Sequence, residues 1–91
     1  MNKTVSVIVE GKVQGVYFRQ STVQQALALG VTGIVCNLPD GSVKIVATGA
    51  DQPLEALLSW CRRGPSRAAV ERVSVQQLPL QQFPDFRIVR P

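Results

Sequence analysis

The stretch EGKVQGVYFRQS, residues 10–21, joins two different sequence patterns and decides how the chain begins to fold. Before it, Val5, Val7 and Val9 fall on alternate positions, which predicts a strand that ends near Lys12. After it, apolar residues recur at helical spacing. The stretch is therefore predicted to be a strand-to-helix junction, and we ask what its glycines and its arginine do there.

The first predicted helix covers residues 20–29. Val23, Ala26 and Leu27 lie at helical spacing, and Gly30 suits the C-terminal end of the helix. VTGIVCN (31–37) and SVKIVATG (42–49) read as two strands, and the PDG turn at 39–41 joins them into a hairpin.

The second predicted helix begins at Asp51, which we expect to cap it, with Pro53 in the first turn. Gly64 and Pro65 end it, and Trp60 is expected to be a partly buried packing residue. One stripe of the helix follows the i, i+3, i+4, i+7 pattern: Leu54, Leu57, Leu58 and Cys61.

A strand over about residues 70–76 and a short final strand over 86–90 complete the predicted elements. Their order predicts an α+β, ferredoxin-like β-α-β-β-α-β domain over residues 1–91, with a short extra C-terminal strand. We expect an antiparallel sheet with both helices on one face. Because this fold hosts enzymes, regulatory modules and RNA binders, function has to be argued from the site.

Composition sets wide limits on the class of protein. The 91 residues are 45% apolar, enough for one globular domain, and no apolar run approaches the ~18 residues of a membrane span. The N-terminus lacks the pattern of a signal peptide, so we expect a cytoplasmic protein that does not contact a membrane. The net charge of +4 favours anionic ligands without choosing among them.

The chain contains no histidine, which excludes Ser-His-Asp and Cys-His catalysis and imidazole metal sites. Its six carboxylates are scattered along the sequence, so we expect neither a bound metal nor another cofactor. Cys36 and Cys61 are predicted to be free thiols. Any catalysis here is expected to avoid a strong side-chain base.

The junction has the features of an anion site. Gly15 permits the positive φ values with which successive N–H groups curl around an anion, and the helix start adds unpaired N–H groups. Arg19 can grip two oxygens of a phosphate or a carboxylate. The plainer alternative is that Gly11 and Gly15 only shape a loop and Arg19 is solvated, and spacing alone leaves that alternative open.

The residues themselves resemble those of the acylphosphatase family. The resemblance rests on GKVQGVYFR (11–19), on GIVCNLPDGSVKIVATG (33–49), on GPSRAAVERV (64–73) and on the C-terminal Phe-x-Ile-x-Arg. It implies a phosphate-binding loop and an arginine that holds the phosphate, which is Arg19 here. It also implies a second catalytic residue, Asn37, at the end of a strand. The loop residues that it assigns to substrate binding are Gly15, Val16, Tyr17 and Phe18.

The resemblance implies an enzyme that hydrolyses acyl phosphates to a carboxylate and inorganic phosphate, without metal or covalent intermediate. The leaving carboxylate has a conjugate acid of pKa roughly 4 to 5, so it departs without a general acid. We expect Asn37 to orient the attacking water, with Ser42 supporting it. The family commonly has Gly-Trp-Val-Arg-Asn at 33–37, where this chain has Ile34 and Cys36. On a strand these two side chains face away from Asn37.

The sequence is compatible with two other functions. A nucleic-acid binder is suggested by the basic charge and by Arg62, Arg63 and Arg67, but the predicted central strands carry no aromatic residue for base stacking. We therefore expect no nucleic-acid partner. The other is an acylphosphatase-like accessory module that binds phosphate without turnover. We expect a monomer, because the open sheet face shows no apolar stripe.

Overall fold

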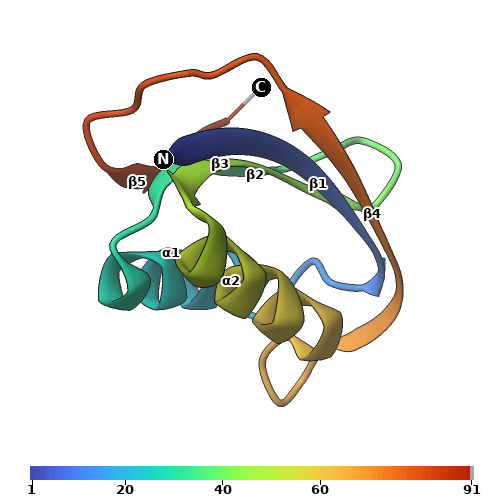
Figure 1. The fold of residues 1–91 in the computed structure, drawn as a ribbon. Helices are drawn as coiled ribbons and strands as arrows, with labels where there is room; N and C mark the ends of the chain where they lie inside the picture. Colours follow the sequence, from blue (N-terminus) through green and yellow to red (C-terminus); the bar gives the residue numbers. More distant parts are fainter. Residues whose placement is uncertain (91) are drawn as a thin grey trace.

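Seven elements follow one another in the computed structural model, which describes residues 1–90 (Figure 1). They are β1 (Asn2–Lys12), α1 (Phe18–Leu29), β2 (Thr32–Asn37), β3 (Val43–Ala50), α2 (Asp51–Arg63), β4 (Ala69–Leu78) and β5 (Phe86–Ile88). The predicted β-α-β-β-α-β order with an extra C-terminal strand is confirmed. Pro91, the last residue of the predicted domain, lies outside the described residues. Neither helix of residues 1–90 is long and apolar enough to cross a lipid bilayer.

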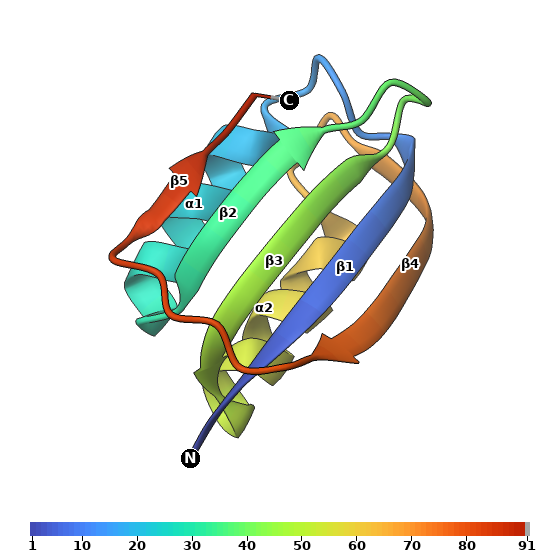
Figure 2. The same ribbon diagram turned by 90° about the horizontal axis from the view of Figure 1, so that it is seen from above.

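The five strands form one sheet in the order β4-β1-β3-β2-β5. The pairs of β1 with β3, β1 with β4 and β2 with β3 are antiparallel, as predicted, whereas β5 runs parallel to β2. Figure 2 shows why: after β4 the chain crosses the end of the sheet before it turns back beside β2. Both helices cover the same face, as expected (Figure 1).

The segment that crosses the sheet is tied to it by hydrogen bonds. The hydroxyl groups of Thr4 and Thr48, on neighbouring strands, lie 2.6 Å apart. Thr48 Oγ1 donates to the carbonyl of Gln81 at 2.8 Å, and the Gln81 N–H donates to Thr4 Oγ1 at 2.9 Å. These bonds fix the route by which the chain brings β5 to the far edge of the sheet.

The core lies between the sheet and the two helices. The alternate valines Val5, Val7 and Val9 are buried beneath the helices. The whole predicted stripe of α2 is also buried, on the side of the helix that faces the sheet. Trp60 is more buried than expected, because its ring packs on Phe18 with 5.4 Å between ring centroids.

The buried face of helix α1 is partly the predicted one, since Ala26 is buried and Val23 packs against the core. The helix begins at Phe18, two residues earlier than expected, and its buried residues are Phe18, Thr22 and Ala26. Leu27, predicted to be on the apolar stripe, is 61% exposed. The early start explains the difference, because Phe18 anchors the helix and selects the positions four and eight residues later. Thr22 is accommodated because its hydroxyl donates to the Phe18 carbonyl at 2.7 Å.

The ends of the helices were predicted in part. Gly30 ends α1 in the left-handed conformation, as expected, and its N–H bonds to carbonyls of the last turn. The prediction that Asp51 caps α2 is wrong: Ala50 holds the N-cap position, without a side-chain hydrogen bond. Asp51 lies in the first turn, where its charge suits the helix dipole, and pairs with Lys3 Nζ at 3.2 Å.

Both cysteines are free, as predicted, and both are buried. Cys61 lies on the buried face of α2, and burial raises the pKa of its thiol to about 12, against an opposing effect of Arg62. The thiolate, which is the reactive form, is therefore suppressed at neutral pH, and Cys61 acts as a core residue.

Gly33 allows β2 to pack between β3 and β5. Its φ is +152°, and a Cβ added there would lie 2.0 Å from the carbonyl oxygen of Val46 and 3.0 Å from the ring of Phe86. A side chain at this position would therefore force the strands apart.

We predict that Gly33→Ala lowers the free energy of unfolding by about 3 kcal/mol, measured by urea denaturation. Gly41→Ala is the matched control, because Gly41 also has a positive φ (+95°) but nothing within 4 Å of the added Cβ. The control should lose about 1 kcal/mol. Equal losses in the two variants would show that the close approach of β3 does not matter.

Candidate active site

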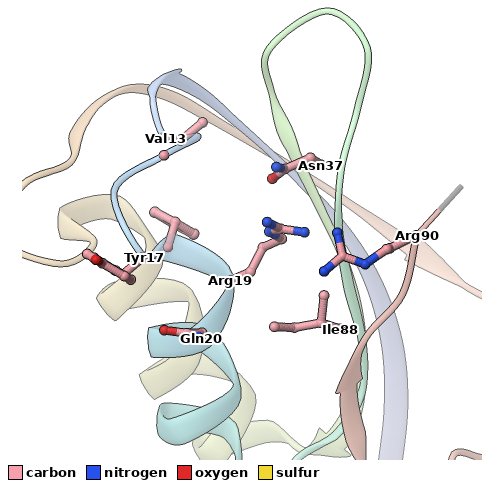
Figure 3. A pocket seen from close by; sticks show the side chains of 9 residues that line it. Val13, Tyr17, Arg19, Gln20, Asn37, Ile88 and Arg90 are labelled. Atoms are coloured by element: carbon pink, nitrogen blue, oxygen red, sulfur yellow. The ribbon is translucent and has the colours of Figure 1, made fainter.

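A cavity of about 340 Å³ opens where three segments meet: the loop between β1 and α1, the end of β2, and the tail after β5 (Figure 3). These segments are far apart in the sequence, and the parallel pairing of β5 with β2 brings the last of them to the site. Nine residues line the cavity: Val13, Gly15, Tyr17, Phe18, Arg19, Gln20, Asn37, Ile88 and Arg90.

The β1–α1 loop has an unusual backbone. Gly15 has φ +74° and Tyr17 has φ +64°, and Tyr17 is the sole non-glycine residue with positive φ among residues 1–90. Such a conformation costs a tyrosine on the order of 1–2 kcal/mol, and strain of this kind clusters at functional sites. The ring of Tyr17 is 65% exposed, so side-chain packing does not explain the strain.

The loop is held in this shape from both sides. Val13, Val16 and Phe18 are buried in the core. The side-chain amide of Gln14 donates to the carbonyls of Leu38 and Ser42, at 2.9 Å each, and so ties the loop to the β2–β3 turn. The site backbone is thus fixed before any ligand arrives.

The loop ends at the N-terminus of α1. The Ser21 N–H is the first at this end to bond back into the helix, to the Tyr17 carbonyl at 3.0 Å. The preceding N–H groups of Phe18, Arg19 and Gln20 therefore have no partner in the helix and carry the positive end of its dipole. With the turn at Gly15, they supply donors for an anion.

Gly11 does not belong to this loop, although sequence analysis grouped it with Gly15. It lies inside β1, at a bulge in the pairing with β4, and a Cβ there would lie 2.2 Å from the carbonyl oxygen of Ala69. Its role is close packing of two strands.

Two arginines give the cavity a positive charge. Arg19, in the first turn of α1, is half-buried, and Arg90 in the tail directs its guanidinium toward it (Figure 3). Neither forms an ion pair within residues 1–90, where the three ion pairs present join Lys3 to Asp51, Arg72 to Glu10 and Arg87 to Asp85. No lining residue in this part of the chain is acidic. The cavity therefore suits an anion carrying more than one negative charge.

Asn37, the last residue of β2, directs its amide into the space above Arg19 (Figure 3). Its Oδ1 is buried and has no hydrogen-bond partner in residues 1–90. An unsatisfied buried acceptor costs about 1–3 kcal/mol, so such an atom in a cavity wall calls for a donor supplied by a ligand or a water molecule.

The structure thus brings together most of the residues singled out from the sequence. Gly15, Tyr17, Phe18, Arg19 and Asn37 line one cavity. The side chain of Val16 lies instead in the core, so only its backbone can contact a ligand.

The expected support of Asn37 by Ser42 is not found. The Ser42 hydroxyl donates to Asp40 Oδ1 at 2.6 Å, and its N–H donates to the same oxygen at 3.0 Å. These bonds hold the pKa of the Asp40 carboxyl below its ordinary value. Ser42 therefore stabilises the β2–β3 turn.

Four lining residues were missed from the sequence: Val13, Gln20, Ile88 and Arg90. The C-terminal Phe-x-Ile-x-Arg motif was noticed, but no role was derived for it. The signal that could have identified Ile88 and Arg90 was the short final strand. Because this strand pairs beside β2, its C-terminal end lies next to Asn37.

The cavity is lined by hydrogen-bond donors rather than by metal-ligating side chains. In the described part of the chain, His, Cys, Asp and Glu side chains do not gather in threes that could hold a metal ion. Guanidinium and backbone N–H groups are donors without an acceptor lone pair, so they suit the oxygens of an anion such as a phosphate or a carboxylate.

The comparisons with known proteins agree with this geometry. A family model described as Acylphosphatase matches residues 5–88. An acylphosphatase of Marinobacter nauticus is 57% identical over 82 residues, which cover 89% of each chain. An acylphosphatase structure from Coxiella burnetii matches with a TM-score of 0.94 and 39% identity, covering 97% of this chain and 93% of that one. One from Bacillus subtilis has a TM-score of 0.93 and 32% identity, covering 98% and 99%.

We predict that Arg90→Gln weakens the binding of inorganic phosphate about three- to fivefold, the effect of removing one exposed charge near an anion. The difference should shrink as salt is added. Isothermal titration calorimetry measures it, with Arg72→Gln on β4, at the sheet edge opposite β5, as the matched control. Equal binding by the wild type and Arg90→Gln at low salt would show that Arg90 does not act on the cavity.

Proposed function

The chain belongs to the acylphosphatase family, which makes it a hydrolase of acyl phosphates, and we propose that it works without metal or covalent intermediate. The observation that carries this proposal is the unsatisfied Oδ1 of Asn37 in a cavity that also holds Arg19 and the strained loop. An acceptor for water and donors for a phosphoryl group then face the same space.

In this proposal the phosphoryl group lies in the loop of residues 15–19. The N–H groups at the start of α1 donate to its oxygens, and the planar fork of Arg19 grips two of them. Arg90 adds a second positive charge at the rim. Because Val13, Val16 and Phe18 hold the loop in place, these donors need no rearrangement as charge develops in the transition state.

Asn37 is proposed to orient the attacking water. The water donates to Oδ1 and attacks phosphorus on the side opposite the acyl oxygen. A new P–O bond forms, the bond between phosphorus and the acyl oxygen breaks, and its electron pair leaves with the carboxylate. Asn37 is no base, so its contribution is positioning.

The chemistry fits a site without acids or bases. The leaving carboxylate needs no proton, since its conjugate acid has a pKa of roughly 4 to 5. The proton of the water is proposed to pass to a phosphate oxygen of the substrate. Among the described residues, the cavity wall contains no Ser, Thr, Cys, His or carboxylate to form a covalent intermediate, and the ring of Tyr17 points away from Arg19 and Asn37 (Figure 3).

We predict that Arg19→Lys lowers kcat/KM for benzoyl phosphate at least a hundredfold, and Arg19→Ala more, because an ammonium cannot reproduce the two-pronged grip. Assays run with a chelator present, after subtraction of the uncatalysed rate, with a phosphate monoester as control substrate. The wild type should hydrolyse the anhydride and spare the monoester. Near-normal turnover by Arg19→Lys would contradict the assignment, and inhibition of the wild type by the chelator would contradict the metal-free mechanism.

We predict that Asn37→Ala lowers kcat about a hundredfold or more and leaves inhibition by inorganic phosphate within about threefold of the wild type. The reason is that Asn37 holds the water, while the loop and Arg19 hold the phosphate. Steady-state kinetics with phosphate as the inhibitor separate the two effects. If inhibition disappears together with turnover, Asn37 is a phosphate-binding residue. A folded wild type that binds phosphate but never turns over would instead be an accessory module.

A further inference from the structure

A second hollow lies beside the cavity, between α1 and β5. This groove has a volume of about 430 Å³ and is lined by Gln20, Val23, Gln24, Arg87 and Ile88. Gln20 and Ile88 line the cavity as well, so the two spaces share a wall. Nothing in the mechanism above uses the groove.

We propose that the groove is the subsite for the acyl group, and that it selects acyl phosphates whose acyl group is uncharged, apolar and longer than acetyl. The inference rests on the proposed function, because it needs the phosphoryl group in the loop and the water on Asn37.

The direction of attack points to the groove. In an in-line displacement the leaving group departs from the side of phosphorus opposite the water. Asn37 lies at one end of the cavity, Gln20 and Ile88 lie at the other, and Arg19 is between them (Figure 3). A water held by Asn37 therefore directs the acyl oxygen toward Gln20 and Ile88, the two residues that line both the cavity and the groove.

The walls of the groove define the chemistry of its occupant. Val23 and Ile88 are half-buried apolar residues packed against the core. The charge of Arg87 is already engaged, since its Nε and Nη2 donate to both carboxylate oxygens of Asp85 at 2.9 and 2.8 Å. Gln20 and Gln24 present neutral amides. Free positive charge lies at the phosphate end, on Arg19 and Arg90, so a charged acyl group has no partner along the groove.

The groove is also shallow on one side, because Gln20, Gln24 and Arg87 are exposed. It therefore covers the first carbons of an acyl chain and leaves the rest in solvent. Discrimination should be strong between acetyl and a chain of several carbons, and weak among longer chains.

The test compares acetyl, butyryl and hexanoyl phosphate, with kcat/KM corrected for uncatalysed hydrolysis. Each methylene that enters the groove should raise wild-type kcat/KM about two- to fourfold. Val23→Thr should lower the ratio of hexanoyl to acetyl kcat/KM about threefold, because a hydroxyl replaces a methyl group in the wall. Gln24→Leu, at an exposed position, should raise the same ratio.

Val75→Thr is the matched control, because Val75 is a partly exposed valine on β4, at the opposite edge of the sheet. It should leave the ratio unchanged. A wild-type kcat/KM that does not change with chain length, with acetyl phosphate still hydrolysed, overturns the subsite and leaves the acylphosphatase activity intact. If none of the three substrates is hydrolysed, both the subsite and the acylphosphatase activity are overturned. If Val23→Thr does not fold, an unchanged ratio in Gln24→Leu overturns the subsite.

Discussion

The packing of Phe18 on Trp60 is the interaction on which the candidate site depends. Phe18 is the first residue of α1, it is 1% exposed, and its ring also lies against Gly64. The preceding residue, Tyr17, has a left-handed conformation at the N-cap, and the following residue, Arg19, lines the cavity. The free energy of core packing thereby holds a strained loop that isolated residues would not adopt. The packing of the core therefore also shapes the site.

Much of the fold could be predicted from the sequence, because it depends on local patterns. The alternate valines of β1 and the apolar stripe of α2 each identify an element and its buried face. In the weakly patterned α1, Val23 and Ala26 were placed correctly and Leu27 was not, since Phe18 was read as part of a loop and not as the anchor. The bonds of Asp51 and Ser42 were also misjudged. Short polar side chains can serve several neighbours, and tertiary contacts decide among them.

The candidate site, too, could be predicted only in part. The loop and Asn37 could be named from the resemblance, and the structure places them around one cavity. Ile88 and Arg90 could not, because they reach the site through a pairing between strands about fifty residues apart, and the parallel direction of β5 was not predicted. With two guanidiniums and one unsatisfied amide oxygen, the site is better suited to stabilising a charged transition state than to transferring protons.

The pairing of β5 with β2 has a consequence for the order in which the molecule folds. The two strands of the β2–β3 hairpin are close in sequence, whereas Gly33 of β2 and Phe86 of β5 are far apart. Closing a long loop costs more chain entropy than closing a short one, so contacts between near neighbours form more easily. We therefore expect the wall formed by Ile88 and Arg90 to be completed after the hairpin, and the cavity to form late in folding.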